Sequence, residues 1–101
     1  MNPRTIEEHK AMWRGIDLIV TFERNWLSSV RPITAHLTIT TAPERQPLPI
    51  TETGYRSHFL PAHAVDDEGG PVAFVLAWLD HEAASPEWKA AELSARQLSL
   101  F

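Results

Sequence analysis

Two stretches of the chain alternate apolar and polar residues with a period of two, and this pattern constrains the fold more than any other feature. The stretches are residues 16–23 and 33–41. On one face of the first lie Ile16, Leu18, Val20 and Phe22, and on one face of the second lie Ile33, Ala35, Leu37 and Ile39. Their many β-branched residues also favour strands. The chain is therefore expected to form a sheet with one apolar face, which a second layer must cover.

The flanking residues predict the rest of the fold. Residues 42–54 contain three prolines and one glycine, which excludes a helix or a central strand and leaves a loop with a short extended piece at Leu48–Thr51. Alternation resumes over residues 55–60 and predicts a third strand. Apolar residues at helical spacing predict a helix over residues 71–84.

Two further helices are expected at the ends of the chain. The pair Thr5 and Glu8 has the spacing of a capping box and predicts a short helix over residues 3–12. The sequence Ser85-Pro86-Glu87 predicts the start of a helix that runs to about Arg96. The expected fold class is α+β, with a three-stranded antiparallel sheet packed on one face by C-terminal helices, and a short N-terminal helix.

Composition limits the classes of protein to consider. The 101 residues are enough for one domain, assigned to residues 1–96, with a peptide motif at residues 97–101. Cysteine is absent, which excludes a disulfide framework, a thiolate zinc site and a cysteine nucleophile. No apolar run reaches the roughly 18–20 residues of a membrane span, and Met1–Lys10 does not resemble a signal peptide. A cytoplasmic protein without a membrane partner is expected.

Charge is unevenly distributed along the chain. Residues 1–60 carry seven basic and six acidic side chains, whereas residues 61–101 carry two basic and seven acidic side chains. The acidic C-terminal part would repel phosphate, so direct nucleic-acid binding is disfavoured.

Sequence motifs of catalysis and cofactor binding are not found. The chain has no GxSxG, Walker or dinucleotide-binding glycine pattern. The spacing of His58, His63 and His81 matches no strong metal-ligand pattern, so these residues are interpreted as surface histidines. We expect no catalytic residue, no metal and no cofactor, and the chain is not expected to be an enzyme.

The last five residues are Gln97, Leu98, Ser99, Leu100 and Phe101. This sequence resembles the peptide motif by which bacterial polymerases and repair proteins bind the replicative sliding clamp. The resemblance implies that the clamp is a protein partner, with Leu100 and Phe101 in an apolar pocket and Gln97 in a polar subsite. Alternatively, the apolar residues pack on the protein's own core as a C-terminal anchor.

A second resemblance involves residues 50–59, which read ITETGYRSHF, followed by an acidic Gly-Gly turn and the helix segment Ala77 to Asp80. These features resemble a family of small proteins without an assigned activity, encoded on plasmids and integrated mobile elements of proteobacteria. The resemblance spans roughly residues 16–101. It implies a setting on a mobile genetic element.

A polar stretch beside the third strand is a candidate recognition surface, because binding residues often lie on loops held by a sheet. Its members are Thr51, Glu52, Thr53, Tyr55, Arg56, Ser57 and His58. The alternative is a turn that satisfies its own backbone, with Glu52 paired to Arg56 and a positive φ at Gly54. Trp26, expected in a loop, is a further candidate because exposed tryptophans often anchor interfaces.

Three functions follow from these observations. The first is a non-enzymatic adaptor of a mobile genetic element, recruited to the sliding clamp through residues 97–101. The second is an inhibitor of a host defence nuclease complex, in which the acidic residues 61–101 mimic phosphate. The third is a small domain with no role at the clamp. Free sheet edges also leave a homodimer open.

Overall fold

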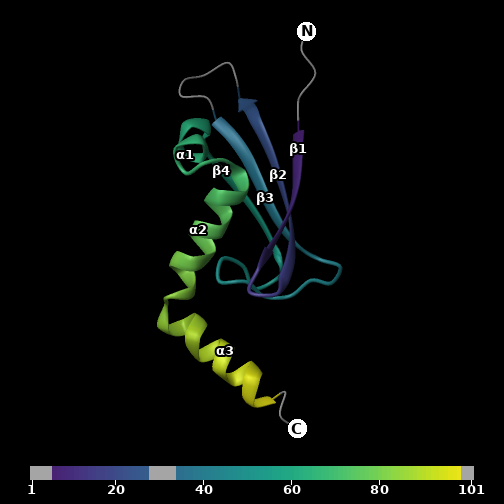
Figure 1. Ribbon diagram of the computed structural model, residues 1–101, viewed down its shortest axis with the longest axis vertical. Coiled ribbons are helices and arrows are strands. Elements are labelled where there is room, and N and C mark those ends of the chain that lie inside the picture. Colours follow the sequence, from purple (N-terminus) through teal and green to yellow (C-terminus); the bar gives the residue numbers. More distant parts are fainter. Residues whose placement is uncertain (1–5, 28–33, 99–101) are drawn as a thin grey trace.

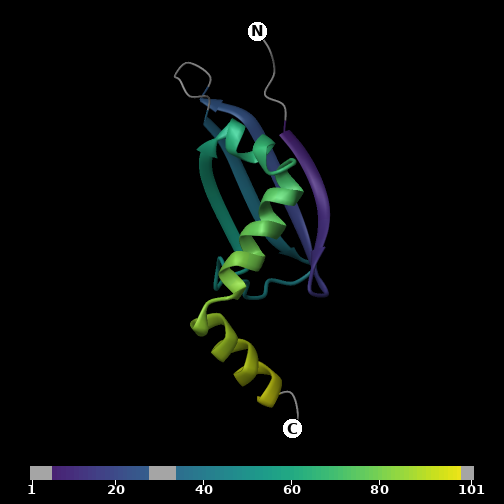
Figure 2. The ribbon, with the colours of Figure 1, turned by 60° about the vertical axis from the view of Figure 1, so that its left-hand side comes forward.

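The computed structural model describes the backbone of residues 6–27 and 34–98 and the side chains of residues 6–24 and 34–95. The elements follow one another as β1 (Ile6–Trp13), β2 (Ile16–Leu27), β3 (Thr34–Ala42), β4 (Tyr55–Pro61), α1 (Ala62–Asp67), α2 (Pro71–Ala83) and α3 (Pro86–Leu98). The strands form one antiparallel sheet in the order β1-β2-β3-β4. Helices α1 and α2 lie over one face of this sheet, and α3 extends away from it (Figures 1 and 2).

The predicted helix over residues 3–12 is wrong, because this segment contains β1. Arg14 and Gly15 both adopt positive φ angles, 48° and 81°, and form a two-residue hairpin loop. Trp13 consequently pairs with Ile16. From there β1 stays paired antiparallel with β2 as far as the pair Ile6–Glu23. The sheet therefore has four strands rather than the expected three.

The other predicted elements are confirmed, with shifted ends. β2 continues to Leu27, so the backbone of Trp26 belongs to a strand and not to a loop. The acidic connection after β4 contains the short helix α1. The N-terminus of α3 is capped as predicted, because the backbone N–H of Trp88 donates to Ser85 Oγ (3.1 Å). α3 runs to Leu98, two residues beyond its expected end.

The core lies between the sheet and helices α1 and α2. Its fully buried side chains are Leu18, Val20, Phe22, Leu37, Ile39, Val65, Val75 and Leu79. The strand residues in this set are the apolar face predicted from alternation. Each such side chain stabilises the fold by about 1.5–3 kcal/mol through removal from water. No helix in the described part of the chain is long and apolar enough to cross a membrane.

The proline-rich loop between β3 and β4 is held by buried Thr41. Thr41 Oγ1 donates to the carbonyl of Glu44 (2.9 Å) and accepts from the backbone N–H of Gln46 (2.9 Å). Leu48 and Thr51 form an isolated antiparallel bridge, where the sequence predicts a short extended piece. Leu48 is itself buried, so the loop closes one end of the core.

Candidate binding surfaces

The strand period divides the predicted recognition stretch between two faces of the sheet. Tyr55 pairs with Thr40, whereas Arg56 pairs with the buried core residue Ile39. Paired residues point to the same face, and successive residues point to opposite faces. Arg56 and His58 therefore lie on the side of the helices, and Tyr55 lies on the uncovered side. The predicted residues do not form one continuous surface.

Thr51 and Thr53 form hydrogen bonds within a turn of the stretch itself. Thr51 Oγ1 donates to the carbonyl of Tyr55 (2.8 Å), and the backbone N–H of Thr53 donates to Thr51 Oγ1 (3.2 Å). Gly54 has the expected positive φ of 83°. These features match the alternative of a self-satisfied turn. The Glu52–Arg56 ion pair of that alternative is not among the interactions of the described residues, and Arg56 donates to the carbonyl of Ile50 instead (3.2 Å).

A groove of about 730 Å³ brings part of the predicted stretch together with α3. Residues 47–53 of the proline-rich loop form one wall, and Trp88 and Ala91 of α3 line the other. Thr51, Glu52, Thr53 and Arg56 from the predicted stretch also line it. The partly buried Trp88 packs against the core. The groove is thus the place where four of the predicted residues do meet.

His58 is part of the packing between β4 and α2. Its ring centroid lies 4.7 Å from that of Trp78, and the guanidinium of Arg56 lies 5.5 Å from the centre of a Trp78 ring. Burial, and then the positive charge of Arg56, lower the pKa of His58 below its ordinary value. No group of three metal-ligating side chains occurs among the described residues.

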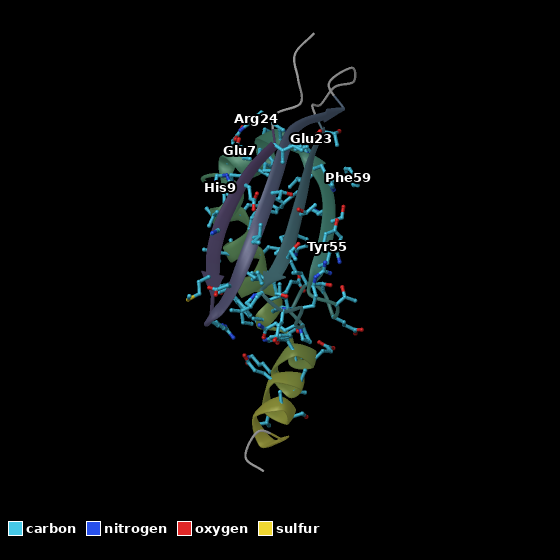
Figure 3. The ribbon with its side chains drawn as sticks, turned by 90° about the vertical axis from the view of Figure 1, so that its right-hand side faces the viewer. Glu7, His9, Glu23, Arg24, Tyr55 and Phe59 are labelled. Carbon is cyan, nitrogen blue, oxygen red and sulfur yellow. The ribbon has the colours of Figure 1, made fainter. Side chains whose placement is uncertain are left out.

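The sheet face opposite the helices, called here the open face, carries large apolar side chains (Figure 3). The exposed fractions are 42% for Tyr55, 51% for Phe59, 62% for Met12 and 59% for Ile6. The ring of His36 stacks on Phe59 at 4.5 Å between centroids. The sequence-based candidates included Tyr55 but missed Phe59. The signal was available, because Phe59 shares the strand parity of Tyr55 and precedes the buried Leu60.

Hydroxyl groups occupy the middle of the open face. Thr21 and Thr38 are hydrogen-bonded through their hydroxyls across β2 and β3. His36 Nε2 and Ser57 Oγ are hydrogen-bonded at 2.7 Å across β3 and β4. These cross-strand bonds join neighbouring strands through their side chains as well as their backbones. The open face is thus an ordered surface with aromatic side chains at the β4 edge.

α3 is attached to the rest of the molecule near its beginning. The rings of Trp88 and Trp13 lie 6.0 Å apart, and Arg14 Nη1 forms an ion pair with Glu92 Oε2 at 3.4 Å. Both contacts involve the β1–β2 hairpin. Farther along, Leu93 is 53% exposed. The helix leads toward the C-terminus away from the sheet (Figure 1).

Several predicted residues lie partly or fully outside the described part of the chain. The backbones of Gln97 and Leu98 form the end of α3, but their side chains are not described. The remaining residues of the motif, Ser99, Leu100 and Phe101, lie outside the described residues, as does the side chain of Trp26.

Comparison with known protein families identifies a family model that matches most of the chain. The model described as the KlcB third domain matches residues 6–88, from the start of β1 to the first turn of α3. The match covers the whole sheet, α1 and α2, and it stops before the C-terminal motif. No curated protein and no solved structure matches the chain.

Proposed function

The chain belongs to the KlcB third-domain family, and we propose that it is a non-enzymatic binding domain recruited to the bacterial sliding clamp through residues 97–101, whose sequence resembles the clamp-binding motif. Membership is consistent with a plasmid-associated accessory protein. In this proposal, the matched residues 6–88 form the folded body. The C-terminal motif lies beyond the matched region and adds a separate binding element to that body.

The observation that carries the proposal is the way α3 leaves the body. Its described side-chain contacts with the β1–β2 hairpin involve Trp88 and Glu92, in the first two turns. The exposed Leu93 follows, and Gln97 and Leu98 end the helix. A motif at the end of a projecting helix is accessible to a partner without unfolding of the core.

The expected affinity is modest. Leu100 and Phe101 contribute about 1.5–3 kcal/mol each when fully buried in a partner. Ordering the backbone costs about 1–2 kcal/mol per residue. Because Gln97 and Leu98 belong to the last turn of α3, binding as an extended peptide also requires that turn to open. Helix ends fray readily. We therefore expect a dissociation constant on the order of micromolar.

The test is fluorescence-anisotropy binding of the intact protein to a purified bacterial sliding clamp. The double variant Leu100→Ala/Phe101→Ala is expected to bind at least about tenfold more weakly, because it loses both apolar anchors. Leu93→Ala is the matched control, since it removes an exposed leucine of α3 outside the motif. The control is expected to bind as the wild type does.

Two results would count against the proposal. One is a folded wild-type protein that does not bind the clamp at micromolar concentrations. The other is a variant lacking residues 97–101 whose melting temperature falls by more than about 5 °C, because such a loss indicates a C-terminal anchor packed on the body. Circular dichroism of each variant separates these outcomes from misfolding.

The phosphate-mimic inhibitor has less support from the structure. Four of the seven acidic residues in 61–101 already interact within the molecule: Asp66 with Arg24, Asp80 with Trp13, Glu82 with His81, and Glu92 with Arg14. Carboxylates with internal partners are less available to a basic channel. The adaptor therefore remains the preferred function.

A further inference from the structure

Within the described residues, the sheet has two free edges, at β1 and β4, and they differ in how they are protected. At the β4 edge, the carbonyl of Tyr55 already accepts hydrogen bonds from the hydroxyls of Thr51 and Thr53. β4 also ends at Pro61, which has no N–H to donate. Such features block the addition of another strand.

The β1 edge lacks these protections. β1 contains no proline, and all eight of its residues pair with β2 in an unbroken register. Its outer side therefore presents a regular row of backbone donors and acceptors. Such an edge is a template for a further strand unless its side chains oppose pairing. The side chains of β1 decide which strand fits.

The open-face side chains of β1 are self-complementary. In chain order they are Ile6, Glu8, Lys10 and Met12, and all four are exposed. The order is apolar, acidic, basic, apolar, with its centre at His9. When two such strands run antiparallel about that centre, each acidic residue faces a basic one and each apolar residue faces an apolar one.

We propose that two copies of this chain form a homodimer in which their β1 strands pair antiparallel about His9. Glu8 then lies opposite Lys10 of the second copy, and Ile6 lies opposite Met12 of the second copy, each pair occurring twice. The four strands of each copy join into one continuous eight-stranded sheet. The partner is a second copy because the complementarity lies within a single strand.

The open-face charges of β1 favour this register over its neighbours. A shift that keeps the same side chains on the open face moves the centre of symmetry to Glu8 or to Lys10. The first places two Glu8 side chains opposite each other, and the second places two Lys10 side chains opposite each other. Like charges directly opposite are destabilising. On the helix side, each His9 stays hydrogen-bonded to its own Glu7 at 2.9 Å (Figure 3).

The test is sedimentation equilibrium of the intact chain from about 1 µM to about 1 mM, the range in which a small interface dissociates. Wild type is expected to dimerise within this range. Glu8→Lys and Lys10→Glu each replace two attractive contacts with two repulsive ones. Each is expected to weaken the dimer on the order of tenfold. The double variant Glu8→Lys/Lys10→Glu exchanges the charges, restores both pairs, and should dimerise within about threefold of wild type.

The matched control is Glu44→Lys, which makes the same change of charge on the exposed loop after β3. It is expected to dimerise as wild type does. The proposal is overturned by a monomeric wild type, by single variants that dimerise normally, or by a folded double variant that stays monomeric. If a strand of another protein occupies this edge instead of a second copy, the purified wild-type chain is monomeric, which is the first of these results. None of these variants alters residues 97–101. The clamp-binding test can therefore succeed or fail independently of the dimerisation test.

Discussion

Gly54 joins the proline-rich loop to β4 at a point where there is no room for a side chain. A Cβ atom there would lie 2.7 Å from the Gln46 backbone nitrogen and 2.7 Å from Thr41 Oγ1. Both atoms belong to the hydrogen bonds that hold the loop. The positive φ of 83° adds a second reason for glycine. This single residue thus fixes the approach of the loop to the sheet.

Gly54→Ala is expected to lower the free energy of unfolding by about 2–3 kcal/mol, since it combines backbone strain with a steric clash. Gly15→Ala provides the control, because Gly15 has a similar φ of 81° but nothing within 4 Å of an added Cβ. It is expected to cost only about 1 kcal/mol of strain. Urea unfolding of both variants measures the difference. An equal loss of unfolding free energy in the two variants would show that the close approach of Gln46 and Thr41 to Gly54 is not important.

At the residue scale, the sequence predicted the turn at Gly54 better than it predicted the recognition surface. The positive φ of Gly54 followed from the need for a turn between a proline-rich loop and a strand. Tyr55 and Arg56 were grouped because they are adjacent in the chain, but the strand sends their side chains to opposite faces. The groove could not be predicted, since it depends on the position of α3 beside residues 47–53. That position is set by tertiary packing.

α3 is the element with the weakest attachment to the rest of the fold. Its contact with the hairpin depends on the Trp13–Trp88 pair and the Arg14–Glu92 ion pair. The ion pair is partly exposed and so contributes little. Trp13 is in turn fixed by its ring N–H, which donates to Asp80 of α2 at 2.9 Å. Trp88 is therefore the main residue that holds α3.

Trp88→Ala is expected to release α3 while the sheet stays folded. Hydrogen exchange of amides in residues 86–95 should rise at least about tenfold, because the local opening free energy falls by more than about 1.4 kcal/mol. Leu93→Ala, at an exposed position on the same helix, should leave exchange nearly unchanged. Hydrogen-exchange mass spectrometry makes the comparison. Unaltered exchange in the Trp88 variant would mean that other contacts hold α3.

Elements with a buried apolar face were predicted well, and β1 was not. In β2 and β3 the alternation is apolar on the core side, so the period is evident in the sequence. In β1 only Trp13 is buried, and the edge strand therefore shows no clear apolar period. The Thr5–Glu8 spacing then favoured a helix. The better signal was Arg14-Gly15, a two-residue sequence between two strands that suits a tight hairpin.

The molecule measures 57 × 26 × 20 Å, and its buried core lies where helices α1 and α2 pack against the sheet. His58 lies at this packing interface, beside Trp78. Its pKa is lowered in the folded state, first by burial and then by Arg56. The unfolded chain therefore binds more protons than the folded chain as the pH falls through and below about 6.5. His58 is therefore expected to lower the free energy of unfolding as the pH falls through this window.

His58→Phe is expected to reduce this loss of stability, because phenylalanine keeps a ring against Trp78 but does not titrate. Urea unfolding at pH 7.5 and pH 5 should show a smaller decrease for the variant than for wild type. His81→Phe is the matched control, since its side chain is 85% exposed. If wild type and the His58 variant lose the same stability on acidification, His58 is not the group responsible.

The order of the elements along the chain has a consequence during protein synthesis. All four strands precede residue 62, and the helix that covers most of the sheet ends at residue 83. At about 5–20 residues per second, a ribosome needs roughly one to four seconds to add residues 62–83, the 22 residues from the end of β4 to the end of α2. During that interval the hairpins can already pair, because their partners are close in sequence. The nascent sheet then exposes the apolar side chains of its inner face, and this is when the growing chain is most vulnerable to aggregation and most in need of a chaperone.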